Sequence, residues 1–132
     1  MTVMVIIGAI TLERMAAAVP QGRKYVRGLL AEGGAHHDAA ELIVSELLTN
    51  AVDHGDGVRM GLLVAEDDDR HRIEVSDGGG AGRTPKVQVD VGPDSERGRG
   101  LLLVATIADE WGVQVRAEGT TVWAELLRKP VG

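Results

Sequence analysis

The sequence predicts a protein of the α/β class, organised as a single domain. A long amphipathic helix pattern covers residues 38–57 and ends at a turn that contains Gly55 and Gly57. Two pairs of strand-like segments follow, and the strands of each pair are joined by a short turn. The first pair is 58–65 with 71–77, joined by an acidic turn, and the second is 113–117 with 121–127, joined at a Glu-Gly turn. With 132 residues the chain has the usual size of one domain and is long enough to bury a core.

The central helix is predicted to start at Asp38, its N-cap, with Glu41 at capping-box spacing. Asn is unfavourable inside a helix because its amide competes for backbone hydrogen bonds. Asn50, one turn after Glu46, therefore indicates a polar group aimed at a ligand; a partly solvated helix flank is the alternative. The apolar residues of this helix share one face, which we expect to pack on the core: Ala40, Ile43, Val44, Leu47 and Ala51.

Two further elements are predicted before this helix. Residues 3–10 are apolar and largely β-branched, which is typical of a buried strand; an apolar helical turn is the alternative. Residues 21–34 have a helical period after Pro20 and end at a Gly-Gly pair. Three basic residues, Arg23, Lys24 and Arg27, lie largely on the polar side of that helix, as a solvated surface or a face for a partner. His36 and His37 are expected in the loop that follows.

Composition excludes several classes of protein. The net charge of −6 argues against a protein that binds the nucleic-acid backbone, and the low aromatic content argues against base-stacking platforms. The absence of cysteine excludes a disulfide scaffold and fits a reducing compartment. No segment reaches the roughly 20 apolar residues of a membrane span, and the apolar start lacks the basic region of a signal peptide, so we expect a cytoplasmic protein.

Glycines gather at two places that have the character of ligand sites. Residues 77–82, Asp-Gly-Gly-Gly-Ala-Gly, follow a predicted strand directly. Such a run bends sharply or lets the backbone approach a ligand, and its position after a strand favours a site over a flexible linker. Residues 83–96 have no period and are long enough to form a lid.

The second place is Gly98-Arg99-Gly100, ahead of a helix predicted to end near Gly112. A helix start with small residues presents free N–H groups and the positive end of the dipole to a phosphate, although many helix starts contain such a pair of glycines. Three signals thus follow one another in the chain: Glu-x-x-x-Asn on a helix, Asp and glycines after a strand, and Gly-x-Gly at a helix start. Their chemistry is complementary, because an Asn oxygen suits Mg²⁺, a carboxylate can act as a general base, and an Asp accepts a hydrogen bond from an exocyclic amine. Together they predict a Mg-nucleotide site without a P-loop.

The order of these motifs resembles that of the GHKL (histidine kinase-like) ATP-binding superfamily. The residues that carry the resemblance are SELLTNAVDHG, IEVSDGGG, ERGRGLLLVATIADEWGV and GTTVWAEL, within residues 19–127. The chain is most similar to the stand-alone anti-sigma factor serine/threonine kinases of actinobacterial type. One departure is Ala81, which stands where the first glycine box is expected to have its last glycine.

The resemblance implies a role for each matching residue. Glu46 would be the general base, Asn50 the Mg²⁺ ligand and Asp77 the partner of the adenine amine, while the role of His54 stays open. The remaining positions are Gly79 for close approach to the nucleotide, a phosphate cradle of Gly98, Arg99, Gly100 and Leu101, and Thr120 or Thr121 at the adenine end, with a hydroxyl or water-mediated contact.

The implied fold is a two-layer α/β sandwich of the Bergerat type, with a mixed, mostly antiparallel sheet and helices on one face. The implied function is that of an ATP- and Mg²⁺-dependent serine/threonine protein kinase that regulates transcription as an anti-sigma factor. Its partners would be a small antagonist protein, a sigma factor and a second copy in a homodimer, without nucleic acid or membrane. The alternative is a non-catalytic ATP-binding module that sequesters a sigma factor or another regulator.

Overall fold

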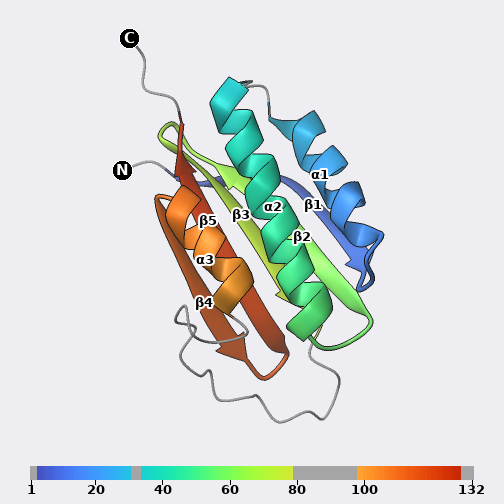
Figure 1. The fold of residues 1–132 in the computed structure, drawn as a ribbon. Coiled ribbons are helices and arrows are strands. Elements are labelled where there is room, and N and C mark those ends of the chain that lie inside the picture. The colour runs from blue at the N-terminus through green and yellow to red at the C-terminus, as the bar shows by residue number, and fades with distance from the viewer. Residues whose placement is uncertain (1–2, 31–33, 79–97, 129–132) are drawn as a thin grey trace.

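The computed structural model describes residues 3–30, 34–78 and 98–128. These residues form a five-stranded sheet in the order β1-β2-β3-β5-β4, in which each neighbouring pair is antiparallel, with the helices on one face (Figure 1). The predicted two-layer α/β fold is confirmed, and the described part of the sheet is antiparallel throughout. In chain order the elements are β1 (Val5–Glu13), α1 (Ala18–Leu29), α2 (Gly34–His54), β2 (Arg59–Glu66), β3 (Arg70–Asp77), α3 (Gly98–Ile107), β4 (Glu110–Arg116) and β5 (Gly119–Leu127).

The core lies between the sheet and helix α2, which crosses the middle of the sheet between α1 and α3 (Figure 1). Strands β2 and β3 alternate buried and partly exposed residues, as expected when one face of a sheet is covered. The predicted apolar face of α2 is confirmed, because all five of its predicted residues are buried: Ala40, Ile43, Val44, Leu47 and Ala51. The helix that carries Glu46 and Asn50 is therefore fixed on a packed core.

Helix α1 packs closely on α2. Gly22 lies against Leu48 of α2, so that even a methyl group at this position would collide with the leucine side chain. Arg27 makes two hydrogen bonds to the carboxylate of Glu41, of 2.7 and 3.1 Å, and Arg23 donates to Ser45 at 3.2 Å. These two basic residues thus join the helices to each other.

Two predictions about α2 were wrong. The helix begins at Gly34, so Asp38 is not its N-cap, and His36 and His37 are helical rather than part of a loop. The additional turn is held by side chains: His36 Nε2 lies 2.9 Å from Nδ1 of the buried His71, whose Nε2 lies 2.9 Å from Glu66 Oε1. This polar chain connects the start of α2 to strands β2 and β3.

Helix α3 ends at Ile107 and not near Gly112, which lies inside β4. The backbone N–H of Asp109 donates to Glu125 of β5 at 2.9 Å, and from there the chain pairs with β5. Gly112 is needed in the strand because the ring of Trp123 covers it, 2.8 Å from where a Cβ would be.

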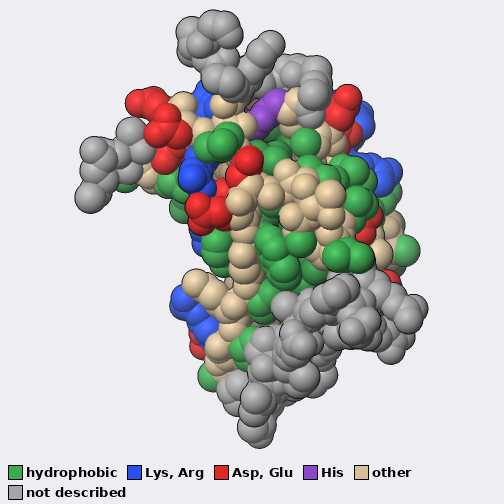
Figure 2. Space-filling model, turned by 60° about the vertical axis from the view of Figure 1, so that its left-hand side comes forward, with side chains coloured by type: hydrophobic (Ala, Val, Ile, Leu, Met, Phe, Trp, Pro, Cys, Tyr) green, Lys and Arg blue, Asp and Glu red, His purple; other side chains and the backbone are tan. Residues whose placement is uncertain are grey.

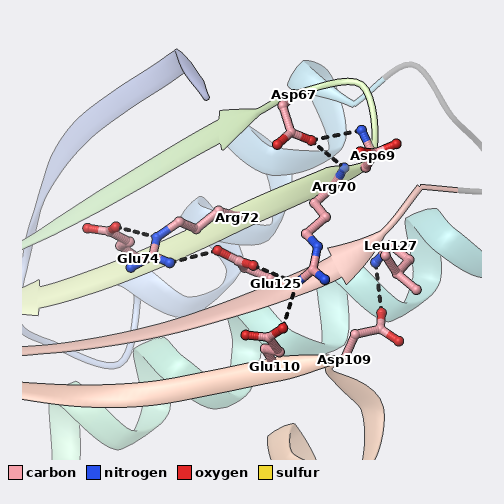
Figure 3. Close-up of polar contacts among 9 residues, drawn as sticks. All are labelled: Asp67, Asp69, Arg70, Arg72, Glu74, Asp109, Glu110, Glu125 and Leu127. Atoms are coloured by element: carbon pink, nitrogen blue, oxygen red, sulfur yellow. Dashed lines mark hydrogen bonds and ion pairs between the residues drawn. The ribbon is translucent and has the colours of Figure 1, made fainter. Parts of the chain in front are cut away.

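The face of the sheet that the helices leave uncovered carries a network of ion pairs (Figure 3). Arg70 pairs with Glu110 and Glu125, at 3.0 and 2.9 Å, and Arg72 pairs with Glu74 and the same Glu125, each at 2.7 Å. The Arg72 guanidinium also lies 4.1 Å from the centre of the Trp123 ring. The three strands β3, β4 and β5 are thereby cross-linked on their outer face.

Hydrophobic side chains reach the surface on the α3 side of the molecule, among charged groups (Figure 2). On α3 itself they include Leu102 and Leu103, whose exposed fractions are 50% and 38%. Within the described ranges no helix is long and apolar enough to cross a membrane.

Candidate nucleotide-binding site

The C-terminal end of α2 meets the end of strand β3. Gly55 follows the helix and donates its backbone N–H to Ala51 at 2.9 Å. A Cβ at Gly55 would lie 3.0 Å from Asp77 Cβ and 3.1 Å from Asp77 Oδ2. Asp77 thus lies beside the residue that follows the helix carrying Glu46 and Asn50, as one common site requires.

Asn50 has an unusual polar atom. Its Oδ1 is buried and receives no hydrogen bond from the described residues. Buried polar atoms are nearly always paired, because an unpaired acceptor costs about 1–3 kcal/mol, so this oxygen is a candidate ligand for a bound group. Glu46 lies one turn earlier on α2 and is partly exposed. A hard oxygen ligand beside a solvent-accessible carboxylate fits a divalent cation that is brought in with a nucleotide.

Asp77 is oriented by the strand on its other side. Its Oδ1 accepts the backbone N–H of Thr120, at the start of β5, at a distance of 3.1 Å. The contribution of Thr120 is therefore a backbone donor, which the sequence prediction of a hydroxyl or water contact did not include. A carboxylate held in this way can accept a hydrogen bond from the exocyclic amine of a purine.

Thr121 is not brought to the same place as Asp77. Successive side chains of a strand point to opposite faces, so Thr121 lies on the outer face while Thr120 and Asp77 lie on the helix side. There Thr121 Oγ1 is 2.9 Å from Ser76 Oγ. This bond supports the β3–β5 pairing behind Asp77.

The predicted phosphate cradle is described only in its backbone. Gly98, Arg99 and Gly100 form the first turn of α3. The first N–H groups of a helix have no partner within the helix and favour an anion. The next residue, Leu101, is buried in the core with an exposed fraction of 2%, and so anchors this helix start. Gly79, Ala81 and the predicted lid at residues 83–96 lie outside the described residues.

Sequence reasoning missed Arg14, which follows β1. Its Nε donates to the carbonyl of Gly57 at 2.7 Å and its Nη1 donates to the carbonyl of Val52, near the end of α2, at 2.6 Å. The partners are 43 and 38 positions away in the sequence, and no local pattern points to them. Only the folded chain identifies this arginine.

The described residues contain no cluster of three or more His, Cys, Asp or Glu side chains placed to hold a metal ion. A cation at this site would therefore depend on Asn50 together with oxygen atoms of a bound nucleotide and water. That is the usual manner of binding of Mg²⁺, which keeps waters and phosphate oxygens in its coordination shell.

The chain belongs to the histidine kinase-like ATPase domain family, whose model matches residues 12–126. The match extends over Arg14, Asn50, Asp77 and Thr120, and it confirms the GHKL superfamily that the motifs resemble. The protein is thus an ATP-binding domain of the histidine kinase-like class. A comparison with curated protein sequences gave no significant match.

Among solved structures, the chain is similar to the crystal structure of the RsbU and RsbW domains of Rv1364c from Mycobacterium tuberculosis. The TM-score is 0.66 with 22% sequence identity, over 93% of this chain and 33% of that one. This similarity supports the fold, and this chain corresponds to one third of the length of that protein.

Proposed function

We propose that this protein is an ATP- and Mg²⁺-dependent serine/threonine protein kinase of the anti-sigma factor type, which phosphorylates a small antagonist protein. The observation that carries the proposal is the buried Oδ1 of Asn50, which receives no hydrogen bond from the described part of the chain and lies one helical turn from Glu46. A nucleotide-binding module needs a cation ligand such as Asn50, whereas a kinase also needs a general base such as Glu46.

In the proposed reaction, ATP is the substrate that supplies the γ-phosphoryl group, and a bound Mg²⁺ would neutralise part of the negative charge of its phosphates. Asn50 would hold the cation through Oδ1, and Asp77 would hold the adenine amine. Glu46 would accept the proton of a serine or threonine hydroxyl while that oxygen forms its bond to the γ-phosphorus. The bond between the γ-phosphorus and the bridging oxygen breaks, and ADP leaves.

Two substitutions on α2 test this proposal. Glu46→Gln should keep ATP binding but lower phosphoryl transfer by roughly 10²–10⁴-fold, the usual effect of losing a general base. Asn50→Ala should lose the Mg²⁺-dependent part of ATP binding as well as transfer. The assay follows radiolabelled γ-phosphate into candidate antagonist proteins of the source organism, alongside ATP binding by calorimetry. Asp38→Asn, which changes an exposed carboxylate three turns from Asn50, is the control and should behave as the parent.

The alternative is a binding module that takes up ATP and sequesters a sigma factor or another regulator without transfer. The exposed Leu102 and Leu103 of α3 favour a protein partner in either case, because large apolar side chains at a surface commonly contact one. A parent protein that binds ATP but phosphorylates none of the antagonists would replace the kinase proposal by this one. A homodimer belongs to the same proposal, and light scattering at several protein concentrations tests it.

A further inference from the structure

We propose that Arg14 is a positioning residue for the adenine end of the site. Arg14 lies in the connection between β1 and α1. Its guanidinium binds the end of α2 and the turn that follows, and this turn packs against Asp77. The inference depends on the proposed role of Asp77 in nucleotide binding. It assigns a function to a residue that lies outside the sequence motifs of α2 and of the glycine-rich segments, although it donates to the carbonyl of Val52 in α2.

The first step is the set of hydrogen bonds that Arg14 donates to the end of α2 and to the turn after it. The guanidinium donates to Val52 at 2.6 Å and to Gly57 at 2.7 Å, and the Arg14 backbone N–H donates to Val58 at 2.8 Å. A helix C-terminus presents unpaired carbonyls and the negative end of the dipole, so a cation is favourable there. The planar guanidinium fixes both carbonyl groups at once, which a lysine ammonium on its flexible stem does less well.

The second step leads from the turn to β3. Gly57 has φ of +81°, a conformation that side chains rarely adopt, and a Cβ there would lie 3.2 Å from the Cα of Gly78. The carbonyl of Asp56 accepts the backbone N–H of Gly78 at 3.1 Å. Gly55 lies beside Asp77 itself, because a Cβ added at Gly55 would be 3.1 Å from Oδ2. The turn therefore touches both Asp77 and the residue after it.

These contacts form a short path from Arg14 to the carboxylate. Apart from the guanidinium, the path runs through backbone atoms, and the turn packs closely on β3, because a Cβ at Gly55 or Gly57 would lie within 3.2 Å of Asp77 or Gly78. Thr120 fixes Oδ1 of Asp77 from β5, and the turn bounds the side of Oδ2. Without Arg14 we expect the turn to move and the carboxylate to lose its defined position, which lowers the affinity for every adenine nucleotide.

The main experiment is a double-mutant cycle with ATP and ADP, measured by calorimetry. Arg14→Met, which keeps the length but removes the donors, should weaken the binding of both nucleotides roughly tenfold, the lower end of the effect of losing one hydrogen bond to a charged group. The factor should be the same with Mg²⁺ and with EDTA, because the adenine end is affected. Arg23→Met, at an arginine that joins α1 to α2, should bind as the parent.

In the background of Asp77→Asn, Arg14→Met should have no further effect, because a residue that acts through Asp77 has nothing left to position. Arg14→Lys should retain part of the affinity, and it replaces Arg14→Met in the cycle if the methionine variant does not fold. An equal loss in both backgrounds would show a general structural role and overturn the inference. Unchanged nucleotide affinity in Arg14→Met would overturn it as well.

A second readout needs no nucleotide. Hydrogen exchange of the Gly78 amide, which donates to Asp56, should be faster in the Arg14 variant than in the parent, while amides in the middle of β3 keep their rates. An unchanged rate at Gly78 would refute the link from Arg14 to β3, whatever the protein binds. If the parent protein binds no ATP, but the Gly78 amide exchanges faster in the Arg14 variant than in the parent, the proposed function is refuted and the link from Arg14 to β3 is retained.

Discussion

Replacing Asp77 by Asn tests the adenine end of the proposed site at almost constant shape. The Asn Oδ1 can still accept the N–H of Thr120, which Asp77 accepts at 3.1 Å, so the strands should remain paired. The second oxygen, beside Gly55, becomes an NH₂ group. Because the exocyclic amine of adenine is also a donor, the hydrogen bond between them is lost. A hydrogen bond to a charged partner contributes about 1.5–3 kcal/mol, so the affinity should fall about 10- to 150-fold.

The assay is calorimetric titration with ATP and with ADP, which should weaken by the same factor because they share the adenine. Asp109→Asn is a matched control. Oδ2 of Asp109 accepts the N–H of Leu127, at the far end of β5, at 2.7 Å (Figure 3). Like Asp77, this carboxylate therefore accepts a backbone N–H of β5, but it lies away from the site. Its variant should bind ATP as the parent does. If folded Asp77→Asn binds ATP with unchanged affinity, the assignment of the adenine contact to Asp77 is wrong.

Three further predictions concern stability. Gly22→Ala should lower the free energy of unfolding by about 1–3 kcal/mol in urea titrations, because the added methyl group collides with α2. Gly28→Ala, on the same helix, places its methyl group where no other atom is near and should not destabilise the fold. Equal effects of the two substitutions would contradict this packing. The hydrogen bonds from Arg27 lower the pKa of Glu41, so this carboxylate stabilises the fold above the pKa of an unfolded Glu, about 4.3, and the effect is lost as pH falls through the lower folded value. Glu41→Gln should therefore flatten the acid side of the melting temperature against pH, and an unchanged slope would refute this. His71→Ala should cost about 2–4 kcal/mol and speed hydrogen exchange at the start of α2, because a buried ring and its hydrogen bonds are removed; protection equal to that of the parent would contradict the role of the polar chain.

The fold was largely predictable because its signals are local. Alternating strands around an acidic turn predict the β2–β3 hairpin, and the apolar period of α2 predicts which side is buried. The errors lie where distant contacts decide. The capping-box pattern at Asp38 predicted a later start of α2, whereas His36 holds an additional turn through a residue 35 positions away. The end of α3 was placed too late because Asp109 pairs with Glu125 of another strand.

The candidate site likewise contains residues that local motifs predict and residues that only distant contacts identify. Glu46, Asn50 and Asp77 stand in short motifs whose chemistry can be read from neighbouring residues. The turn of Gly55 and Gly57 was predicted, but not its contact with Asp77 and Gly78, which depends on how α2 lies on the sheet. Arg14 and the backbone N–H of Thr120 could not be predicted, since their partners are distant in the sequence and any residue type supplies a backbone donor.

The contacts that assemble the adenine end also determine when it can exist. Asp77 and Thr120 are 43 positions apart, as are Arg14 and Gly57, so the site closes only after chain segments of this length have come together. A nascent chain that has formed α2 and the β2–β3 hairpin still lacks the donor from β5. ATP would consequently recognise the chain only after its last hairpin has been synthesised and has joined the sheet. By mass action the nucleotide would then favour the complete fold over every shorter intermediate, by RT ln(1 + [ATP]/Kd).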